Sequence, residues 1–366
     1  MNWHSEDFQK YPHGLANISR KVHEAGMKFG LWFAPQMVES SLIGGRIPES
    51  WVAKRDGKNL VTVADSTWPT ITQICMGDRE VIEFLKKSMA SAVRKYNLDW
   101  IKWDNSGLPG RACNRSDHGH EAGDGHIAAL EGEYEIWNYL HTQFPNLVLE
   151  QCGYPSRLDY GLARYLRTNW LSDSSDNPTH VRRNILNGSY IYPAGCLEAW
   201  VYKGAETDKE KDPDILDTTM RSRMIGHPGF GMLVKDPNGV ERVSLYPKVA
   251  IEAAKRNIAN YKKYRHLLYE DVYHLLPVST APDQWDAVQY CKRDGNESVA
   301  IWFCGARPQA EKTFVLMGLK PDANYSLTSL NTGRSEKVGG AQLMSEGVKI
   351  SFAKAGMSEI LLLKRD

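Results

Sequence analysis

The chain has 366 residues, 42% hydrophobic and 24% charged, so it can bury a large core and has the composition of a globular protein. Its 45 Lys and Arg nearly balance its 44 Asp and Glu, which argues against nucleic acid or a membrane surface as a partner. Six scattered cysteines without a CxxC pair predict reduced thiols rather than a disulfide framework. The N-terminus shows no apolar signal region, so the sequence as written predicts a cytoplasmic protein.

Helices and strands are expected to alternate along most of the chain. A helix that ends near a Gly and leads into a continuous apolar strand is half of a β/α unit. Residues 34–70 interrupt this pattern and are expected to form a long irregular loop of the kind that walls an active site. Helices are expected at residues 13–25, 78–96 and 127–144, shortly after 159, from 178, and at 213–226 and 246–268. Strands are expected at 27–33, 98–103, 146–150, 168–173, 189–192 and 229–234.

The alternation predicts a parallel sheet and an α/β fold. A TIM-type (β/α)8 barrel fits better than a doubly wound sheet, because no GxGxxG turn occurs. About six strands are recognisable where a closed barrel needs eight, so the barrel is expected to be incomplete at the N-terminus. Short alternating runs separated by turn residues follow. We therefore expect two domains: a catalytic β/α barrel over residues 1–270 and a C-terminal antiparallel β-sandwich over residues 271–366.

Two acids follow predicted barrel strands. Asp104 ends the run 100–103, and Asp173 ends the run 168–172, so both are expected at the same mouth of the barrel. Glycoside hydrolysis needs two facing carboxylates, about 5–5.5 Å apart in retaining enzymes. Lys102 would keep the Asp104 carboxylate ionised or bind a sugar hydroxyl. On spacing alone, Asp104 could instead cap a turn, and Asp176 is expected to cap the helix that begins near residue 178.

Cysteine, histidine and acidic residues gather between Cys113 and His126, which raises the alternative of a metal site. No zinc-like spacing recurs elsewhere, and retaining glycosidases need no metal, so a solvated loop is the favoured interpretation. No metal and no cofactor are expected. A serine hydrolase is also disfavoured, because the chain has no Gly-x-Ser-x-Gly elbow.

Four segments, in this order and at these gaps, resemble glycoside hydrolase family 36, the melibiase-type α-galactosidases, which are related to family 27. They are residues 26–35, 101–105, 152–159 and 170–173, and residues 318–325 are similar to that family's C-terminal β domain. The resemblance implies a retaining hydrolase of terminal α-galactosides, acting through a glycosyl-enzyme intermediate on an oligosaccharide. It implies Asp104 as nucleophile and Asp173 as acid/base, and it implies that five residues bind the sugar: Trp32, Lys102, Asn105, Cys152 and Trp170.

The chain also departs from the family. Ala34-Pro35-Gln36 stands where Glu-Pro-Glu is usual, Gly77 replaces an Asp, and the first barrel strands and the N-terminal β-sandwich have no counterpart. These departures keep two alternatives open: a retaining hydrolase or transglycosylase for another α-glycoside, and a truncated non-catalytic chain that binds sugar. A barrel short of strands would expose strand edges, so homo-oligomerisation is also expected.

Overall fold

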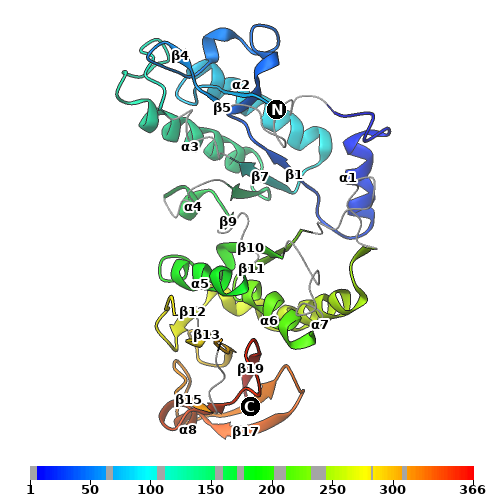
Figure 1. Cartoon of the computed structure of the whole chain (residues 1–366), viewed down its shortest axis with the longest axis vertical. Helices are drawn as coiled ribbons and strands as arrows, with labels where there is room; N and C mark the ends of the chain where they lie inside the picture. Colours follow the sequence, from blue (N-terminus) through cyan, green and yellow to red (C-terminus); the bar gives the residue numbers. More distant parts are fainter. Residues whose placement is uncertain are drawn as a thin grey trace. The chain divides into compact units, whose positions relative to one another are not determined.

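The structure is a computed structural model that describes residues 6–62, 69–104, 112–152, 160–170, 177–201, 212–231, 245–281, 283–306 and 311–366. The chain forms two compact units, Met1–Trp170 and Leu171–Asp366. Figure 1 shows the elements of both units along the chain.

The first unit is built of β/α repeats around a parallel sheet in the order β1-β7-β8-β9 (Figure 1). Its strands and helices alternate as the sequence predicted, with boundaries shifted by a few residues. The strands are β1 (Gly30–Phe33), β7 (Trp100–Asp104), β8 (Val148–Cys152) and β9 (Thr168–Trp170). The helices are α1 (Gly14–Glu24), α2 (Arg79–Tyr96), α3 (Gly125–Gln143) and α4 (Tyr160–Arg164).

The side chains of β7 alternate between two faces, as the pleat of a strand requires. Ile101 and Trp103 are buried on one face, where the Trp103 indole donates to Glu133 of α3 at 2.9 Å and packs edge-on against Trp137. The opposite face carries Lys102 and Asp104. Since α3 covers the apolar face of the strand, the polar face is left for the site.

The segment before β7 is fastened by Asp99. Burial opposes its ionisation, but hydrogen bonds from Lys28, the Phe29 backbone N–H and His23 lower the pKa of Asp99 to about 2. These contacts join the entry of β7 to α1 and to the residues just before β1. The carboxylate therefore helps to fix the register of the first two parallel strands.

The segment from Ala34 to Gln73 is more regular than expected. The prediction of an irregular loop was wrong for its described part, because short strands pair within it. β2 (Met37–Glu39) and β5 (Val61–Thr62) both pair antiparallel with β6 (Ile71–Gln73), and β3 (Lys54–Arg55) forms a hairpin with β4 (Lys58–Asn59). Short 3-10 turns at Ser40–Leu42 and Glu49–Trp51 connect them. The segment thus forms a small folded subdomain.

The second unit opens with β/α elements. Its parallel pair is β10 (Leu197–Val201) and β11 (His227–Phe230), and its helices are α5 (Pro178–Gly188), α6 (Pro213–Met224) and α7 (Lys248–Tyr264). The strand expected at residues 189–192 was wrong: that stretch is a turn with Ile191 65% exposed, and the strand lies at β10. Asn177, not Asp176, caps α5, accepting from the N–H groups of residues 179 and 180. Asp176 itself lies outside the described residues.

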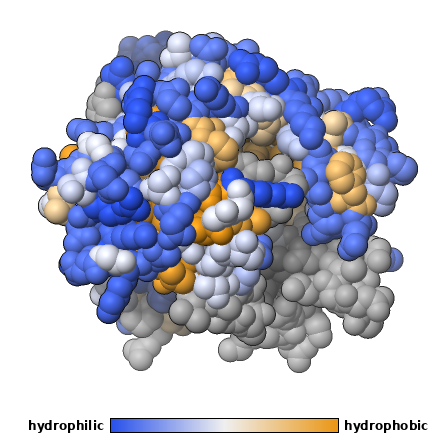
Figure 2. Space-filling model, turned by 90° about the horizontal axis from the view of Figure 1, so that it is seen from above, coloured by the Kyte–Doolittle hydropathy of each residue, from blue (hydrophilic) through white to orange (hydrophobic). Residues whose placement is uncertain are grey.

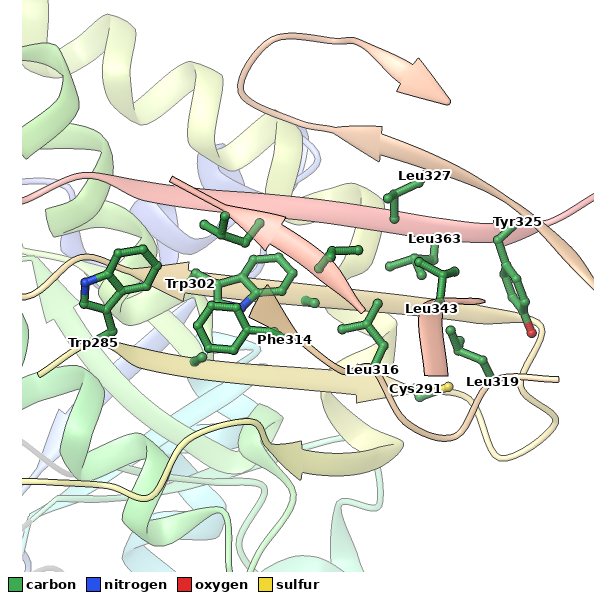
Figure 3. Close-up of a cluster of buried hydrophobic side chains, with 14 of the residues drawn as sticks. Trp285, Cys291, Trp302, Phe314, Leu316, Leu319, Tyr325, Leu327, Leu343 and Leu363 are labelled. Carbon is green, nitrogen blue, oxygen red and sulfur yellow. The ribbon is translucent and has the colours of Figure 1, made fainter. Parts of the chain in front are cut away.

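The end of the chain forms an antiparallel sheet, as predicted, in the order β12-β13-β14-β19-β16-β17, with a separate pair, β15 and β18. Figure 3 shows its core, where Trp285, Trp302 and Phe314 lie among leucines from the strands and from the segments that connect them. The strands are β12 (Asp271–His274), β13 (Asp286–Cys291), β14 (Glu297–Phe303), β15 (Lys312–Phe314), β16 (Asn324–Ser329), β17 (Ser335–Gly339), β18 (Val348–Ile350) and β19 (Ser358–Arg365), and the one helix among them is α8 (Gly340–Ser345).

Within the second unit, this sheet is tied to the helices that precede it. Arg182 and Arg183 of α5 both donate to the buried carboxylate of Asp286 on β13. The hydroxyl of Tyr290 donates to the backbone carbonyl of Ile225 at 2.8 Å. The domain boundary at residue 270 stays a prediction.

Large exposed hydrophobic side chains are spread along the chain, with Phe8 62% and Ile191 65% exposed. The face in Figure 2 is mostly hydrophilic, with a group of hydrophobic residues near its middle. Among the described helices, none has the length and apolar character needed to cross a membrane.

Candidate active site

Asp104 is the last residue of β7, at the carboxyl end of the parallel sheet where β/α proteins place their catalytic groups. The indole of Trp32, on β1, donates to Asp104 Oδ2 at 3.0 Å. Trp32 pairs in register with Lys102, and its side chain is 37% exposed, so the ring borders solvent beside the carboxylate. A donor at this distance fixes the orientation of the carboxylate.

Lys102 lies on the same face of β7 as Asp104, two residues earlier. Its ammonium forms an ion pair with Glu150 on β8, its register partner. The Trp100 indole donates to the other Glu150 oxygen at 2.7 Å. Because the Lys102 and Glu150 side chains are only 14% and 4% exposed, the pair is a buried, directed contact. Glu150 thus orients the lysine, and the effect of Lys102 on Asp104 stays a prediction.

Sequence reasoning missed Glu150. Its signal was present: an acid lies in the middle of a buried strand, at the position that pairs with Lys102 once the strands are in register. Gly30 is a second missed requirement. A Cβ there would lie 2.7 Å from the Trp100 Cβ, so β1 can pass Trp100 only with glycine at this position.

The other predicted site residues are only partly placed. Cys152 is the register partner of Asp104, is buried, and ends β8, so it lies at the same edge of the sheet. Trp170 ends β9, and only its backbone is described. Asn105 and Asp173 lie outside the described residues, so the distance between the two predicted catalytic acids stays a prediction.

A second group of functional side chains lies in the first unit, in the loop before α3. Cys113, His118 and His120 come from that loop, and Cys75 follows β6; their sulfur and nitrogen atoms all lie within 4.8 Å of one another. The expectation of a solvated loop was wrong for these residues, because all of them are buried. Cys75 is 0% exposed, Cys113 and His118 are each 2% exposed, and His120 is 9% exposed. A hydrogen bond shared with Cys75 lowers the pKa of Cys113 and raises that of Cys75.

Neither cysteine is in a disulfide, and the same holds for the other four, all of which lie among the described residues. The prediction of reduced thiols is confirmed in this respect. Sequence reasoning singled out the segment 113–126 but not Cys75, which is brought to it only by the folding of the subdomain before α2.

The fold and the site together define a β/α protein with an acid at the carboxyl end of a parallel strand and an antiparallel domain at the C-terminus. Residues 2–270 match the family model described as Melibiase, and residues 285–363 match the glycosyl hydrolase family 36 C-terminal domain. The chain therefore belongs to the melibiase family, and the resemblance found in its motifs is confirmed.

Among curated proteins, the chain is 26% identical over 347 residues to α-galactosidase Mel36A of Lactobacillus acidophilus, covering 93% of this chain and 44% of that protein. It is 26% identical over 343 residues to the bifunctional α-galactosidase/sucrose kinase AgaSK of Mediterraneibacter gnavus, covering 92% of this chain and 33% of that protein. The chain thus spans less than half the length of these relatives.

Solved structures show the same fold. The galactosidase domain of AgaSK superposes with a TM-score of 0.76 at 22% identity, covering 99% of this chain and 47% of that one. A variant of the Geobacillus stearothermophilus α-galactosidase AgaA in complex with raffinose gives 0.76 at 19% identity, covering 97% and 47%. The predicted fold class is confirmed, including a parallel sheet short of a full barrel in the residues that the structure describes.

Proposed function

We propose that this chain carries the catalytic centre of a retaining α-galactosidase. One observation carries the proposal: in a member of the melibiase family, Asp104 ends β7 with its carboxylate held by the Trp32 indole. A carboxylate fixed at the open edge of the sheet, beside a half-exposed aromatic ring, suits attack on a sugar.

In the proposed first step, a carboxylate oxygen of Asp104 forms a bond to the anomeric carbon as the glycosidic bond breaks. Asp173 gives its proton to the departing oxygen, which leaves as an alcohol. In the second step, Asp173 takes a proton from water, and the water oxygen displaces Asp104. Two inversions at one carbon return the product with the configuration of the substrate.

Three neighbours of Asp104 support sugar binding in this scheme. Trp32 offers a ring face that suits the apolar face of a sugar, while its N–H holds the nucleophile. Lys102 keeps its position on the polar face of β7 through Glu150, from where its ammonium can donate to sugar hydroxyls. Cys152 borders the same edge from β8.

For the substrate, we propose oligosaccharides that end in an α-galactosyl unit. Solved relatives of the same fold have raffinose and stachyose bound, which are sugars of this class. The substitutions at Ala34-Pro35-Gln36 favour testing other α-glycosides beside galactosides.

The test is turnover of a panel of nitrophenyl α-glycosides by the whole chain and by Asp104→Asn. A matched control is Asp99→Asn, which makes the same change at the other end of β7, compared at equal folded fraction. We expect the galactoside to be cleaved fastest, the Asp104 variant to lose at least about a thousandfold, and the control to keep its rate. Equal background turnover by all three proteins on every sugar would favour the non-catalytic alternative instead.

A further inference from the structure

Two cysteines and two histidines meet in the first unit, and none of the four is a predicted sugar-binding residue. Cys75 follows β6, and the other three residues occupy the loop that leads into α3. Ala53 and Leu60 pack around the two thiols, so the cluster has an apolar shell. Buried groups of this kind need partners, and this set is the ligand set of many zinc sites.

The distances fit a tetrahedral ion. With Zn–S bonds of about 2.3 Å and Zn–N bonds of about 2.05 Å, a tetrahedral angle puts sulfur and nitrogen about 3.5 Å apart. Cys75 Sγ lies 3.4 Å from His120 Nε2, and Cys113 Sγ lies 3.6 Å from His118 Nδ1. Two of the six edges of the tetrahedron therefore match a zinc site, and the four ligand atoms all lie within 4.8 Å of one another.

The histidine rings are also turned correctly. His118 Nε2 lies 2.6 Å from the Ser50 carbonyl, and His120 Nδ1 lies 2.9 Å from the Glu121 carbonyl. Since a carbonyl oxygen only accepts, each of these nitrogens donates its proton there, which leaves His118 Nδ1 and His120 Nε2 as the ring nitrogens that face the thiols. A carbonyl behind each ligating imidazole is the usual outer shell of a metal site.

The backbone is shaped for the same arrangement. The backbone N–H groups of Gly77 and Arg115 hydrogen-bond to the sulfurs of Cys75 and Cys113, respectively. A Cβ on Gly77 would lie 2.9 Å from the His120 ring, so that ring needs a glycine there. Gly119, with φ of +76°, reverses the chain between the two histidines.

We propose that a structural zinc ion binds at this place, held by Cys75 Sγ, Cys113 Sγ, His118 Nδ1 and His120 Nε2. Two thiolates and two neutral imidazoles around Zn²⁺ give an uncharged complex, which suits a buried site. On binding, each thiol proton still present leaves to solvent as the Zn–S bond forms. Four protein ligands leave no position for water or substrate, so the role is structural.

The ion would fasten two distant segments to each other. It joins the end of β6 to the loop that follows the strand of Asp104, and so anchors the start of α3 and the subdomain of residues 34–73. Its loss is expected to loosen this side of the first unit.

The test is the metal content of the whole chain, expressed with added zinc and dialysed. We expect close to one zinc per chain, and less than a tenth of that in Cys113→Ser and in His118→Ala. The matched controls are His126→Ala, an exposed histidine of the same segment, and Cys196→Ser, a cysteine of the other unit; both should keep the zinc.

Two readouts on the unmutated protein keep the test decisive if a variant fails to fold. Cobalt replacing zinc should give strong visible bands of a tetrahedral site and a thiolate charge-transfer band. X-ray absorption at the zinc edge should show two sulfur and two nitrogen neighbours. Folded protein that holds no zinc or cobalt above background, a disulfide between Cys75 and Cys113, or a zinc shell without sulfur would each overturn the proposal.

Discussion

The buried pair of Lys102 and Glu150 gives a prediction that depends on the geometry of the site and not on turnover. We consider Lys102→Met and Glu150→Gln, alone and together. At about 3 Å and an effective dielectric of about 20, the two charges attract by about 5 kcal/mol before the cost of removing them from water. Since the side chains are 14% and 4% exposed, neither variant can be compensated fully by solvent.

Each single variant should lower the free energy of unfolding by about 3–5 kcal/mol, because it leaves one buried charge facing a neutral group. The double variant should cost less than the sum, with a coupling energy of about 2–3 kcal/mol. The pair Arg20 and Glu24, whose side chains are 60% and 59% exposed, is the control and should couple by no more than about 0.5 kcal/mol.

The measurement is urea unfolding of the unmutated protein, the two single variants and the double variant, and of the corresponding variants of the control pair. Unfolding is followed by circular dichroism and by hydrogen exchange in peptides that cover β7 and β8. The exchange data report on the first unit alone, where the pair lies. Additive costs for Lys102 and Glu150, with a coupling no larger than that of the exposed control, would refute the inference that Glu150 orients the lysine.

Two further predictions concern carboxylates that hold elements together. The pKa of Asp99 is about 2, below its ordinary 3.8, so its stabilisation is complete above about pH 4 and is lost as the pH falls toward 2. Asp99→Asn should remove this loss of stability at low pH and lower the free energy of unfolding by about 2 kcal/mol at neutral pH. Urea unfolding at a series of pH values measures both effects, and the same dependence of stability on pH in the variant and the unmutated protein would contradict the prediction. Asp286→Asn should lower the free energy of unfolding by about 3–5 kcal/mol, because it leaves the buried charges of Arg182 and Arg183 without their carboxylate. The control is Asp322→Asn at an exposed position, which should change the free energy of unfolding by less than about 0.5 kcal/mol in the same urea assay. Equal stability of these last two variants would show that the buried cluster contributes nothing.

The parallel part of the fold was predictable because its signals are local. Helices with one apolar face, such as α2, and mostly apolar strands, such as β1, follow from spacing within the segment. The strand expected at residues 189–192 failed because Tyr190 and Ile191 are β-prone residues in an exposed turn, where Tyr190 stacks on His274. That contact with β12 could not be read from the neighbouring sequence.

The candidate site also combines residues that local sequence signals reveal with residues that only long-range contacts bring together. Asp104 was found from its place after a strand, which is a local signal. The partnership of Lys102 with Glu150 depends on strand register, and the nearness of Cys75 to Cys113 depends on the folding of residues 34–73. Long-range contacts of this kind carry no periodic pattern, so sequence reasoning treated the cysteine and histidine loop as solvated.

The central claim is that Asp104 becomes covalently bonded to the sugar, and trapping that bond tests it most directly. In a galactosyl fluoride with a second fluorine at carbon 2, that fluorine slows both steps, while the anomeric fluorine leaves readily as fluoride ion and keeps the first step faster than the second, so the glycosyl-enzyme on Asp104 should accumulate. Mass spectrometry of the whole chain should show one added fluorogalactosyl group, and fragmentation should place it on Asp104. A label on another residue, or no label on protein that still cleaves α-galactosides, would contradict the account.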